Sequence, residues 1–513
     1  FNDRHDLSVM VGTSHESENY DRFTAKRINF DQQENMSLQL GSAQDQNAWS
    51  EGNQWTINSF FSRVNYTFAN KYVIEGTIRA DGSSRFDPDH RWGWFPGVNA
   101  AWRVGEEGFM KRLGWFEDLK VRASYGEMGN QSGIGLYDYI QLISLSNDYY
   151  PFGAGMKGQM ATSGNIISTS RTWETIQTTN VGFDFSTLNN RLYGSFDYFW
   201  KENKNMLIPK TYPSMLGADA PSTNSGHLSI HGWEISLGWR DQIKDFSYSV
   251  RFNISDAKNK VVDRVGSNLI KLGNNETPTG YPLNSYFGYE FDGIIQNEQE
   301  LEAYKSRFSE GGIPGDLSVG DAMYKDLDGD GKLSVLGDGK EGSGDVKYLG
   351  DKNPRYNFGF NLSMAWKGFD LSAFIQGVGR RTMFLEGESR CPMPEAWYQS
   401  AEYWYGKTWT PERTDAQYPA ITLKDKRNYN YYVSTNTKFN VAYARLKNLQ
   451  FGYTIPQTLT SKAGLQKVRV YFSGEDLFEV HNTPNGWDPE ENSGSITSYP
   501  FTRNYSFGIN VVF

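Results

Sequence analysis

Apolar and polar side chains alternate residue by residue in many segments of the chain. Between Phe246 and Ser255, every even-numbered residue is apolar and every odd-numbered residue is polar or charged. A repeat of two residues is the period of a β-strand whose two faces meet different surroundings. The same alternation is found at residues 6–15, 55–67, 71–82, 92–104, 118–127, 173–187, 191–202, 227–240, 246–255, 355–367, 369–378, 438–454, 467–476 and 500–513. The pattern predicts an all-β fold with about fourteen strands.

The connections between these segments are of two unequal kinds. Short turns such as residues 68–71 and 188–190 alternate with three long segments, at 128–172, 259–354 and 379–437. A transmembrane β-barrel has short periplasmic turns at one end and long extracellular loops at the other. The spacing therefore favours a transmembrane antiparallel β-barrel whose extracellular loops are the three long segments. A soluble β-sandwich is the alternative that the pattern leaves open.

The two faces of the segments differ in the way that a barrel requires. Arg122, Arg251 and Arg469 fall on the polar face, which would line a watery lumen, while the rings fall on the face that would meet lipid. The last segment alternates in the same manner and ends on Phe513, and a terminal aromatic residue is the usual ending of outer-membrane barrels. We therefore expect the chain to lie in the outer membrane, in contact with lipid and lipopolysaccharide.

The composition excludes several other classes of protein. Of the 513 residues, 38% are apolar, and no run approaches the roughly 18 apolar residues of a membrane-spanning helix. The chain has 51 Lys and Arg against 60 Asp and Glu, and a net charge of −9 argues against nucleic acid as a partner. Its single cysteine, Cys391, cannot form an intrachain disulfide.

Short motifs spread along the chain match the pattern of one family. The first is Arg79–Phe86, followed by Arg91–Pro96 and Ala100–Arg103. The others are Leu119–Gly126 with Gly129–Gln131, Trp173–Glu174, Asn180–Gly182, Gly232–Glu234, Tyr324–Gly331, Asn353–Tyr356, Gly368–Leu371, Arg445–Asn448 and Asp488–Glu490. With these motifs in this order, the chain resembles the SusC/RagA family of TonB-linked outer-membrane transporters from about residue 79 to Phe513.

The resemblance implies a barrel of about 22 strands that is plugged by an N-terminal domain. Such a transporter imports oligosaccharides or peptides, is closed by a surface lipoprotein of the SusD type, and is driven by the TonB–ExbB–ExbD complex through the plug. Nothing in this chain resembles the plug, so residues 1–513 correspond to the C-terminal part of the barrel, and a second polypeptide or the rest of a longer chain would complete the wall. A self-contained passive porin or surface-binding barrel is the alternative function.

The best candidate for bound metal is the segment Asp326–Ser334. Carboxylates at its positions 1, 3 and 5 and glycine at position 6 copy the start of a calcium-binding EF-hand loop. The predicted ligands of a structural Ca²⁺ are Asp326, Asp328, Asp330, the carbonyl of Lys332, and Asp338. Position 12, which should be a carboxylate, is Gly337, so Asp338 would serve through a distorted loop. A polar, glycine-rich turn without metal is the alternative.

Aromatic rings are concentrated in the long loops. Flat rings beside polar groups suit the binding of sugars or peptides, and the candidates for substrate contact are Tyr149, Tyr150, Trp397, Trp404 and Trp409. The same rings could instead pack the loops together or contact the lid lipoprotein.

An enzyme is not expected. His227 and His231 lie four apart on a predicted strand, about 13 Å from each other, and cannot share one metal. Adjacent acids such as Glu490 and Glu491 could in principle hydrolyse a glycosidic bond, but neighbouring acids in a turn are usually solvated surface.

Overall fold

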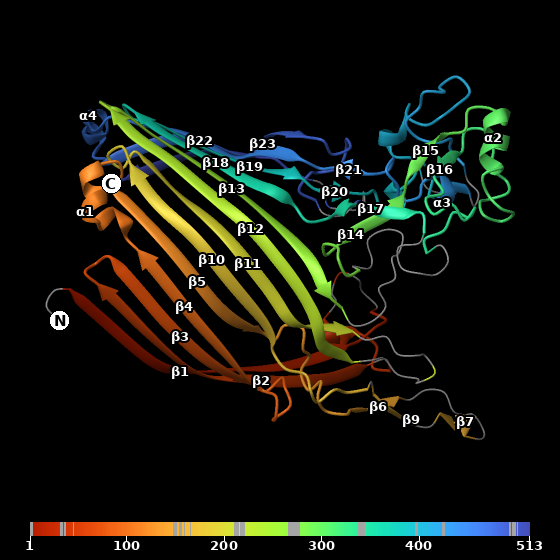
Figure 1. Ribbon diagram of the computed structural model, residues 1–513, viewed down its shortest axis with the longest axis horizontal. Coiled ribbons are helices and arrows are strands. Elements are labelled where there is room, and N and C mark those ends of the chain that lie inside the picture. Colours follow the sequence, from red (N-terminus) through yellow and green to blue (C-terminus); the bar gives the residue numbers. More distant parts are fainter. Residues whose placement is uncertain are drawn as a thin grey trace. The chain divides into compact units, whose positions relative to one another are not determined.

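The computed structural model consists mainly of β-strands that run side by side in one large antiparallel sheet (Figure 1). It describes the whole chain except residues 1–3, 31–33, 35–36, 45, 147–150, 153–155, 158–159, 165, 210–214, 216–220, 265–277, 337–343, 395–398, 423–425, 492–493, 495–498 and 500. Among the described residues, no helix is long and apolar enough to cross a bilayer.

Fourteen strands form the large sheet, and their order in the sheet is their order along the chain. They are β1 (His5–Lys26), β2 (Asn47–Phe68), β3 (Tyr72–Ser83), β4 (Trp92–Trp102), β5 (Asp118–Asn130), β10 (Glu174–Thr187), β11 (Leu192–Pro209), β12 (Ser222–Ile243), β13 (Phe246–Asp263), β18 (Arg355–Trp366), β19 (Phe369–Arg380), β22 (Tyr443–Thr454), β23 (Lys467–His481) and β24 (Asn504–Val512). This up-and-down order confirms the predicted all-β fold class and the number of strands.

Several strands are much longer than the alternation predicts. β1 and β2 each have 22 residues and remain paired from His5 opposite Phe68 to Lys26 opposite Asn47. A transmembrane strand needs only about 9–11 residues to cross the hydrocarbon. Beyond residue 15 the alternation in β1 stops, because Tyr20 and Phe23 fall on opposite faces among polar residues, but the pairing with β2 continues.

The contacts within the chain divide it into two compact units. The first comprises Phe1–Ala100, Ser124–Thr179 and Glu202–His227, and the second comprises Ala101–Ala123, Asn180–Lys201 and Leu228–Phe513. The core of the first unit is small and aromatic, and it is formed by Phe86, Phe95, Ile134 and Trp173.

The register in the second unit keeps like side chains in rows across the strands. Val250 of β13 lies opposite Leu362 of β18, which lies opposite Ala373 of β19. On the other face one polar row runs across six strands, through Ser249, Ser363, Ser372, Gln450, Ser473 and Ser506. The two faces of the sheet are therefore chemically distinct across these six strands, as the alternation predicts.

Short helices and small two-stranded sheets lie at the ends of the strands of the second unit. Helices α1 (Gly108–Leu113) and α4 (Gln457–Thr460) lie at the end with short turns (Figure 1). The opposite end carries the small sheets β14 (Ser285–Tyr289) with β17 (Val346–Asp351), β15 (Phe291–Ile294) with β16 (Ala322–Tyr324), and β20 (Thr382–Met383) with β21 (Phe439–Asn440), together with helices α2 (Glu298–Lys305) and α3 (Lys426–Asn430).

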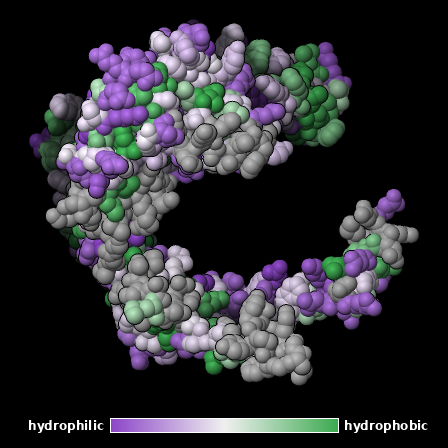
Figure 2. Space-filling model, turned by 90° about the vertical axis from the view of Figure 1, so that its right-hand side faces the viewer, coloured by the Kyte–Doolittle hydropathy of each residue, from purple (hydrophilic) through white to green (hydrophobic). Residues whose placement is uncertain are grey.

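In the first unit, the connection between β5 and β10 forms two hairpins. They pair β6 (Ile143–Ser146) with β9 (Met160–Ser163) and β7 (Pro151–Phe152) with β8 (Met156–Lys157). On the surface shown in Figure 2, hydrophilic and hydrophobic residues are interspersed.

Candidate functional site

The aspartate-rich segment lies between β16 and β17, on the edge of a well-packed group of loop residues. The core of this group, which we call the loop core, is formed by Tyr289, Ile295, Leu301, Tyr304, Leu317, Ala322, Tyr324 and Tyr429. Leu333 and Val346, which flank the aspartates, pack against it. The carbonyl of Gly331 accepts hydrogen bonds from the backbone N–H and the hydroxyl of Ser309, at 2.8 and 2.9 Å. The segment is thus held by packing against the loop core and by the hydrogen bonds from Ser309.

The aspartates themselves shape the turn. Asp326 accepts hydrogen bonds from the backbone N–H groups of Gly329 and Gly331, at 2.6 and 2.9 Å. Both glycines have φ of 75°, a left-handed conformation that costs glycine little. Asp328 and Asp330 each accept a bond from the backbone N–H two residues later. These local hydrogen bonds curve the backbone so that the carboxylates of Asp326 and Asp328 lie close together.

Three carboxylates meet in this turn: Asp326, Asp328 and Asp345. One oxygen from each lies within 4.8 Å of the others. Two oxygens bound to one Ca²⁺ at about 2.3–2.6 Å are at most about 5 Å apart, so the spacing fits a shared cation. Asp345 is fully buried and is oriented by the backbone N–H groups of Leu327 and Ser334, at 2.6 and 2.8 Å.

The electrostatics of Asp328 and Asp345 agree with a shared cation. Burial, together with the charges of Asp328 and Asp326, raises the pKa of Asp345 above its usual value. Desolvation and the charges of Asp330 and Asp326 raise the pKa of Asp328. Crowded carboxylates repel one another, and a divalent cation between them would remove that repulsion.

The structure groups the predicted metal ligands differently from the sequence pattern. Asp326 and Asp328 lie together, whereas the carboxylate of Asp330 is bonded to the N–H of Lys332 at 2.7 Å and is not one of the three. Asp338 lies outside the described residues. Asp345 was missed because it follows Asp326 by nineteen residues, far beyond the length of an EF-hand loop. No spacing in the sequence indicated it.

Two of the five candidate rings for substrate contact are buried in the loops. Trp404 is 3% exposed and packs edge-on against Tyr418, with ring centroids 4.8 Å apart. Trp409 is 9% exposed, and its Nε1–H donates to Oε1 of Gln296 at 3.0 Å. Burial of this kind is what the packing alternative expects. Tyr149, Tyr150 and Trp397 lie outside the described residues.

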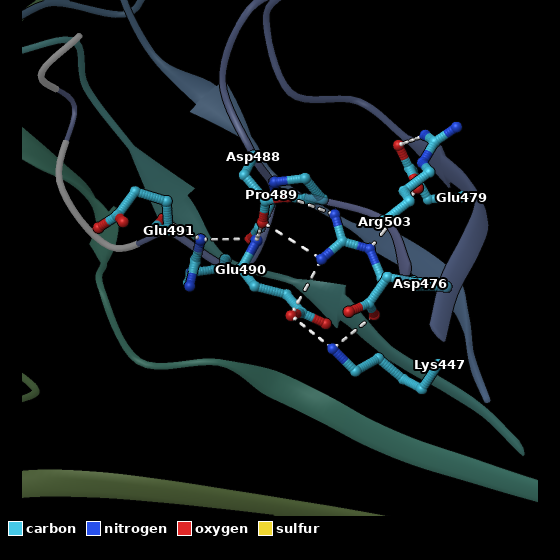
Figure 3. A network of polar contacts seen from close by, with 10 residues as sticks. Lys447, Asp476, Glu479, Asp488, Pro489, Glu490, Glu491 and Arg503 are labelled. Carbon is cyan, nitrogen blue, oxygen red and sulfur yellow. Dashed lines mark hydrogen bonds and ion pairs between the residues drawn. The ribbon is translucent and has the colours of Figure 1, made fainter. Parts of the chain in front are cut away.

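The motifs Arg445–Asn448 and Asp488–Glu490, forty residues apart, meet in one ion-pair network (Figure 3). The Arg445 side chain is fully buried, and its guanidinium contacts Asp488 at 2.5 Å and Glu490 at 3.0 Å. Lys447 also contacts Glu490 at 3.0 Å, and it reaches Asp476 at 2.7 Å. A buried guanidinium needs such partners, because an unpaired buried charge is costly. The network ties the connection between β23 and β24 to β22.

The Arg445 guanidinium has further contacts besides Asp488 and Glu490. Phe501 lies over the guanidinium, with its ring centroid 4.2 Å from Cζ. Glu479 lies 3.7 Å from Nε and also pairs with Arg503 at 2.5 Å. In the sequence, Arg445–Asn448 and Asp488–Glu490 were notable only for their resemblance to a family. The structure shows that their side chains pair with each other and connect the two segments.

The arrangement of strands and motifs agrees with a comparison against protein families. The family model described as "TonB dependent receptor-like, beta-barrel" matches residues 1–477. The chain belongs to this family. The proteins of this family are outer-membrane β-barrels, and this gives the chain its location.

Individual relatives of this TonB-dependent receptor barrel extend the comparison. TonB-dependent receptor P3 of Formosa agariphila is 31% identical over 539 residues, which cover 99% of this chain and 51% of the relative. TonB-dependent receptor SusC of Bacteroides thetaiotaomicron is 27% identical, with 91% and 45% covered. Both relatives are named as TonB-dependent receptors.

A solved structure supports the fold. The structure of the RagAB peptide transporter matches with a TM-score of 0.81 at 22% identity, covering 99% of this chain and 53% of that chain. The chain thus spans about half the length of the relatives it matches.

Proposed function

We propose that this chain forms part of the barrel wall of a TonB-dependent nutrient importer of the SusC type. The observation that carries the proposal is the family match over residues 1–477, supported by the 27% identity to SusC. In this proposal the complete protein takes up oligosaccharides or peptides. A SusD-like lipoprotein covers its outer mouth, and the TonB–ExbB–ExbD complex supplies energy through a plug.

The ion pairs on the polar face of the sheet support a wall that encloses water. Arg122 of β5 contacts Asp197 of β11 at 2.5 Å and Asp184 of β10 at 3.2 Å. Arg469 of β23 contacts Asp370 of β19 at 2.5 Å. Charges spaced along one face of a membrane sheet are tolerated where that face meets a polar interior.

Uptake measured in the native host tests the proposal. The strain would be grown on single glycans or peptides, with the gene intact, with the gene deleted, or with TonB depleted. The proposal expects at least one nutrient whose uptake is lost in both altered strains. Native mass spectrometry of the protein extracted in mild detergent should also show a bound lipoprotein. Uptake that persists without TonB would contradict the proposal and favour a passive porin.

We also propose that Asp326, Asp328 and Asp345 hold a structural Ca²⁺. The convergence of three carboxylates on one turn supports it, and the carbonyl of Lys332 is a further predicted ligand. The ion would fasten the turn to the loop core, which is a structural role.

Calcium titration calorimetry on the complete, EDTA-treated protein tests this site. Asp345→Asn should weaken binding by about tenfold or more, because it removes the charge of a proposed ligand. Asp330→Asn is the matched control, since its carboxylate lies apart from the three, and we expect a smaller effect. Equal affinity of Asp345→Asn and the unaltered protein would refute the proposed ligand set.

A further inference from the structure

A cavity of about 430 Å³ in the second unit is lined by fifteen residues, of which five are lysine or arginine and one is His231. It lies where the loop ends of β13, β18 and β19 approach β17. Its basic side chains are Lys258, Lys260, Arg355, Arg380 and Arg381, and its one acidic side chain is Asp351. The cavity therefore carries a strong excess of positive charge in a protein whose net charge is negative.

Most of this positive charge is not neutralised within the described part of the chain. Arg355 forms a bidentate pair with the buried Asp256. By contrast, no described residue forms an ion pair with Lys258, Lys260 or Arg380. A group of cations that repel one another at the protein surface is usually kept for an anionic partner.

Arg381 is held in place by backbone carbonyls. Its Nη2 donates to the carbonyls of Pro489 and Glu491, at 2.7 and 2.9 Å. These two bonds fix the direction of the Arg381 guanidinium at the wall of the cavity. The network around Arg445 holds this same stretch of chain (Figure 3).

The positive charge of Arg380 also affects a neighbouring lysine, Lys438. The pKa of Lys438 lies below its usual value because of burial and because of the positive charges of Arg380 and Lys347.

An exposed ring lies in the wall of the cavity, in a strained backbone conformation. Tyr356 has φ of 56°, which is unusual for a bulky residue, and its side chain is 42% exposed. The guanidinium of Arg355 lies over this ring, 5.4 Å from its centroid. Strained residues of this kind persist where the surrounding structure holds them, and they are frequent at ligand sites.

We propose that this cavity binds an acidic oligosaccharide, through carboxylate or sulfate groups on its sugars. The cations would hold the anionic groups, the ring of Tyr356 would stack on a sugar face, and Asn259 and Asn353 would bond to hydroxyls. The lining combines the cations with the two asparagines and with the rings of Tyr348 and Tyr356. An acidic sugar offers the matching groups, which are anions, hydroxyls and an apolar ring face. The inference deepens the proposed import function and rests on it for its biological role.

Binding is tested on the complete protein in detergent, without transport. The probes are tetragalacturonate, a chondroitin sulfate tetrasaccharide, maltotetraose as the neutral control, a tetra-aspartate peptide, and lipopolysaccharide. The proposal expects the acidic sugars to bind and maltotetraose to bind at least about tenfold more weakly, with an affinity that falls as salt rises. The double variant Lys258→Gln/Lys260→Gln should weaken binding of the acidic sugars by about tenfold or more.

The control removes two cations elsewhere on the same strands. Lys244 and Lys367 lie in the turns at the far ends of β13 and β18, about 45 Å of strand away from Lys258. Lys244→Gln/Lys367→Gln should leave binding within about twofold of the unaltered protein.

Several results would overturn the proposal. These are equal loss in both double variants, no binding of the acidic sugars, or binding of the peptide alone. Binding of lipopolysaccharide alone would reassign the cavity to the membrane's own glycolipid. Failure of the import function is distinguishable, because it would leave binding of the acidic sugars intact but abolish their TonB-dependent uptake.

Discussion

Aromatic side chains have opposite environments in the strands and in the loops. On the strands, Trp94 is 66% exposed and Phe507 is 82% exposed, whereas in the loop core Tyr304 and Tyr324 are at most 1% exposed. A water-soluble protein does not leave such rings uncovered along a whole sheet. The difference shows that the strands and the loops are built for two solvents, lipid and water.

The buried tyrosines of the loop core use their hydroxyl groups for hydrogen bonds inside the protein. Tyr304 shares a hydrogen bond with the hydroxyl of Tyr429 at 2.8 Å and donates to the carbonyl of Tyr324 at 3.1 Å. The hydroxyl of Tyr324 donates in turn to the carbonyl of Tyr429. Tyr304, Tyr324 and Tyr429 can be buried there because each of their hydroxyls has a hydrogen-bond partner, and burial without one would be costly.

The largest expected effect is the loss of a ring from the loop core. Tyr324→Ala should lower the free energy of local unfolding of residues 285–335 by about 3–5 kcal/mol, and lost hydrogen bonds add to this. Hydrogen exchange of the loop amides measures the change. Tyr72→Ala, at a strand ring that is 42% exposed, is the matched control and should cost much less. Equal costs would remove the contrast between loops and strands.

Removal of the buried guanidinium tests the joint between strands and loops. Arg445→Met should lower stability by about 3–5 kcal/mol, because Asp488 and Glu490 would lose a buried partner. Arg503→Gln breaks an exposed pair and should cost less than about 1 kcal/mol. Urea unfolding with the heat-modifiable gel shift as readout would measure both, and a mild effect of Arg445→Met would show that the network is dispensable.

A charge on the lipid face should cost more than the same charge on the polar face. Leu362 and Asn361 are neighbours on β18 and point to opposite sides. Leu362→Arg should destabilise the protein in lipid bilayers by about 2–4 kcal/mol. Asn361→Arg should stay within about 0.5 kcal/mol. Folding titrations in vesicles would compare the two, and the reverse order would mean that the faces are assigned wrongly.

The smallest expected effect is a pH dependence in the loops. Hydrogen bonds from Lys325 and Lys347 lower the pKa of Glu290 to about 2. Because the folded pKa is depressed, this stabilisation is complete above the ordinary pKa near 4.5 and is lost as pH falls toward 2. Glu290→Gln should therefore be less stable than the unaltered protein at pH 7, and the two should converge at acid pH. A difference that grows on acidification would contradict the assignment.

The fold was predictable from the sequence because the side chains of each strand alternate between a face suited to lipid and a face suited to water. All fourteen segments correspond to strands of the sheet. The outer parts of strands such as β1 were not predictable, because mostly polar residues with isolated rings on either face leave no alternation, while the backbone pairing continues. The same holds for the loop core, whose rings looked like candidates for ligand contact until their burial was known.

The candidate site was predictable only where its residues are close in sequence. Asp326 and Asp328 stand out as neighbours in a recognisable loop, but Asp345 reaches them through the chain's path around the loop core. The basic cavity assembles Lys258, Arg355 and Arg380 from three strands, and the sheet register that brings them together is a tertiary property.

The most direct test of the account is the solvent met by each face of a strand. A spin label would be placed in turn at Phe360, Asn361, Leu362 and Ser363 of β18, in the complete protein with Cys391→Ala, reconstituted in bilayers. The account predicts that collision with oxygen dominates at 360 and 362 and that collision with a water-soluble nickel chelate dominates at 361 and 363. Equal accessibility to the chelate at all four positions would contradict a lipid-facing wall.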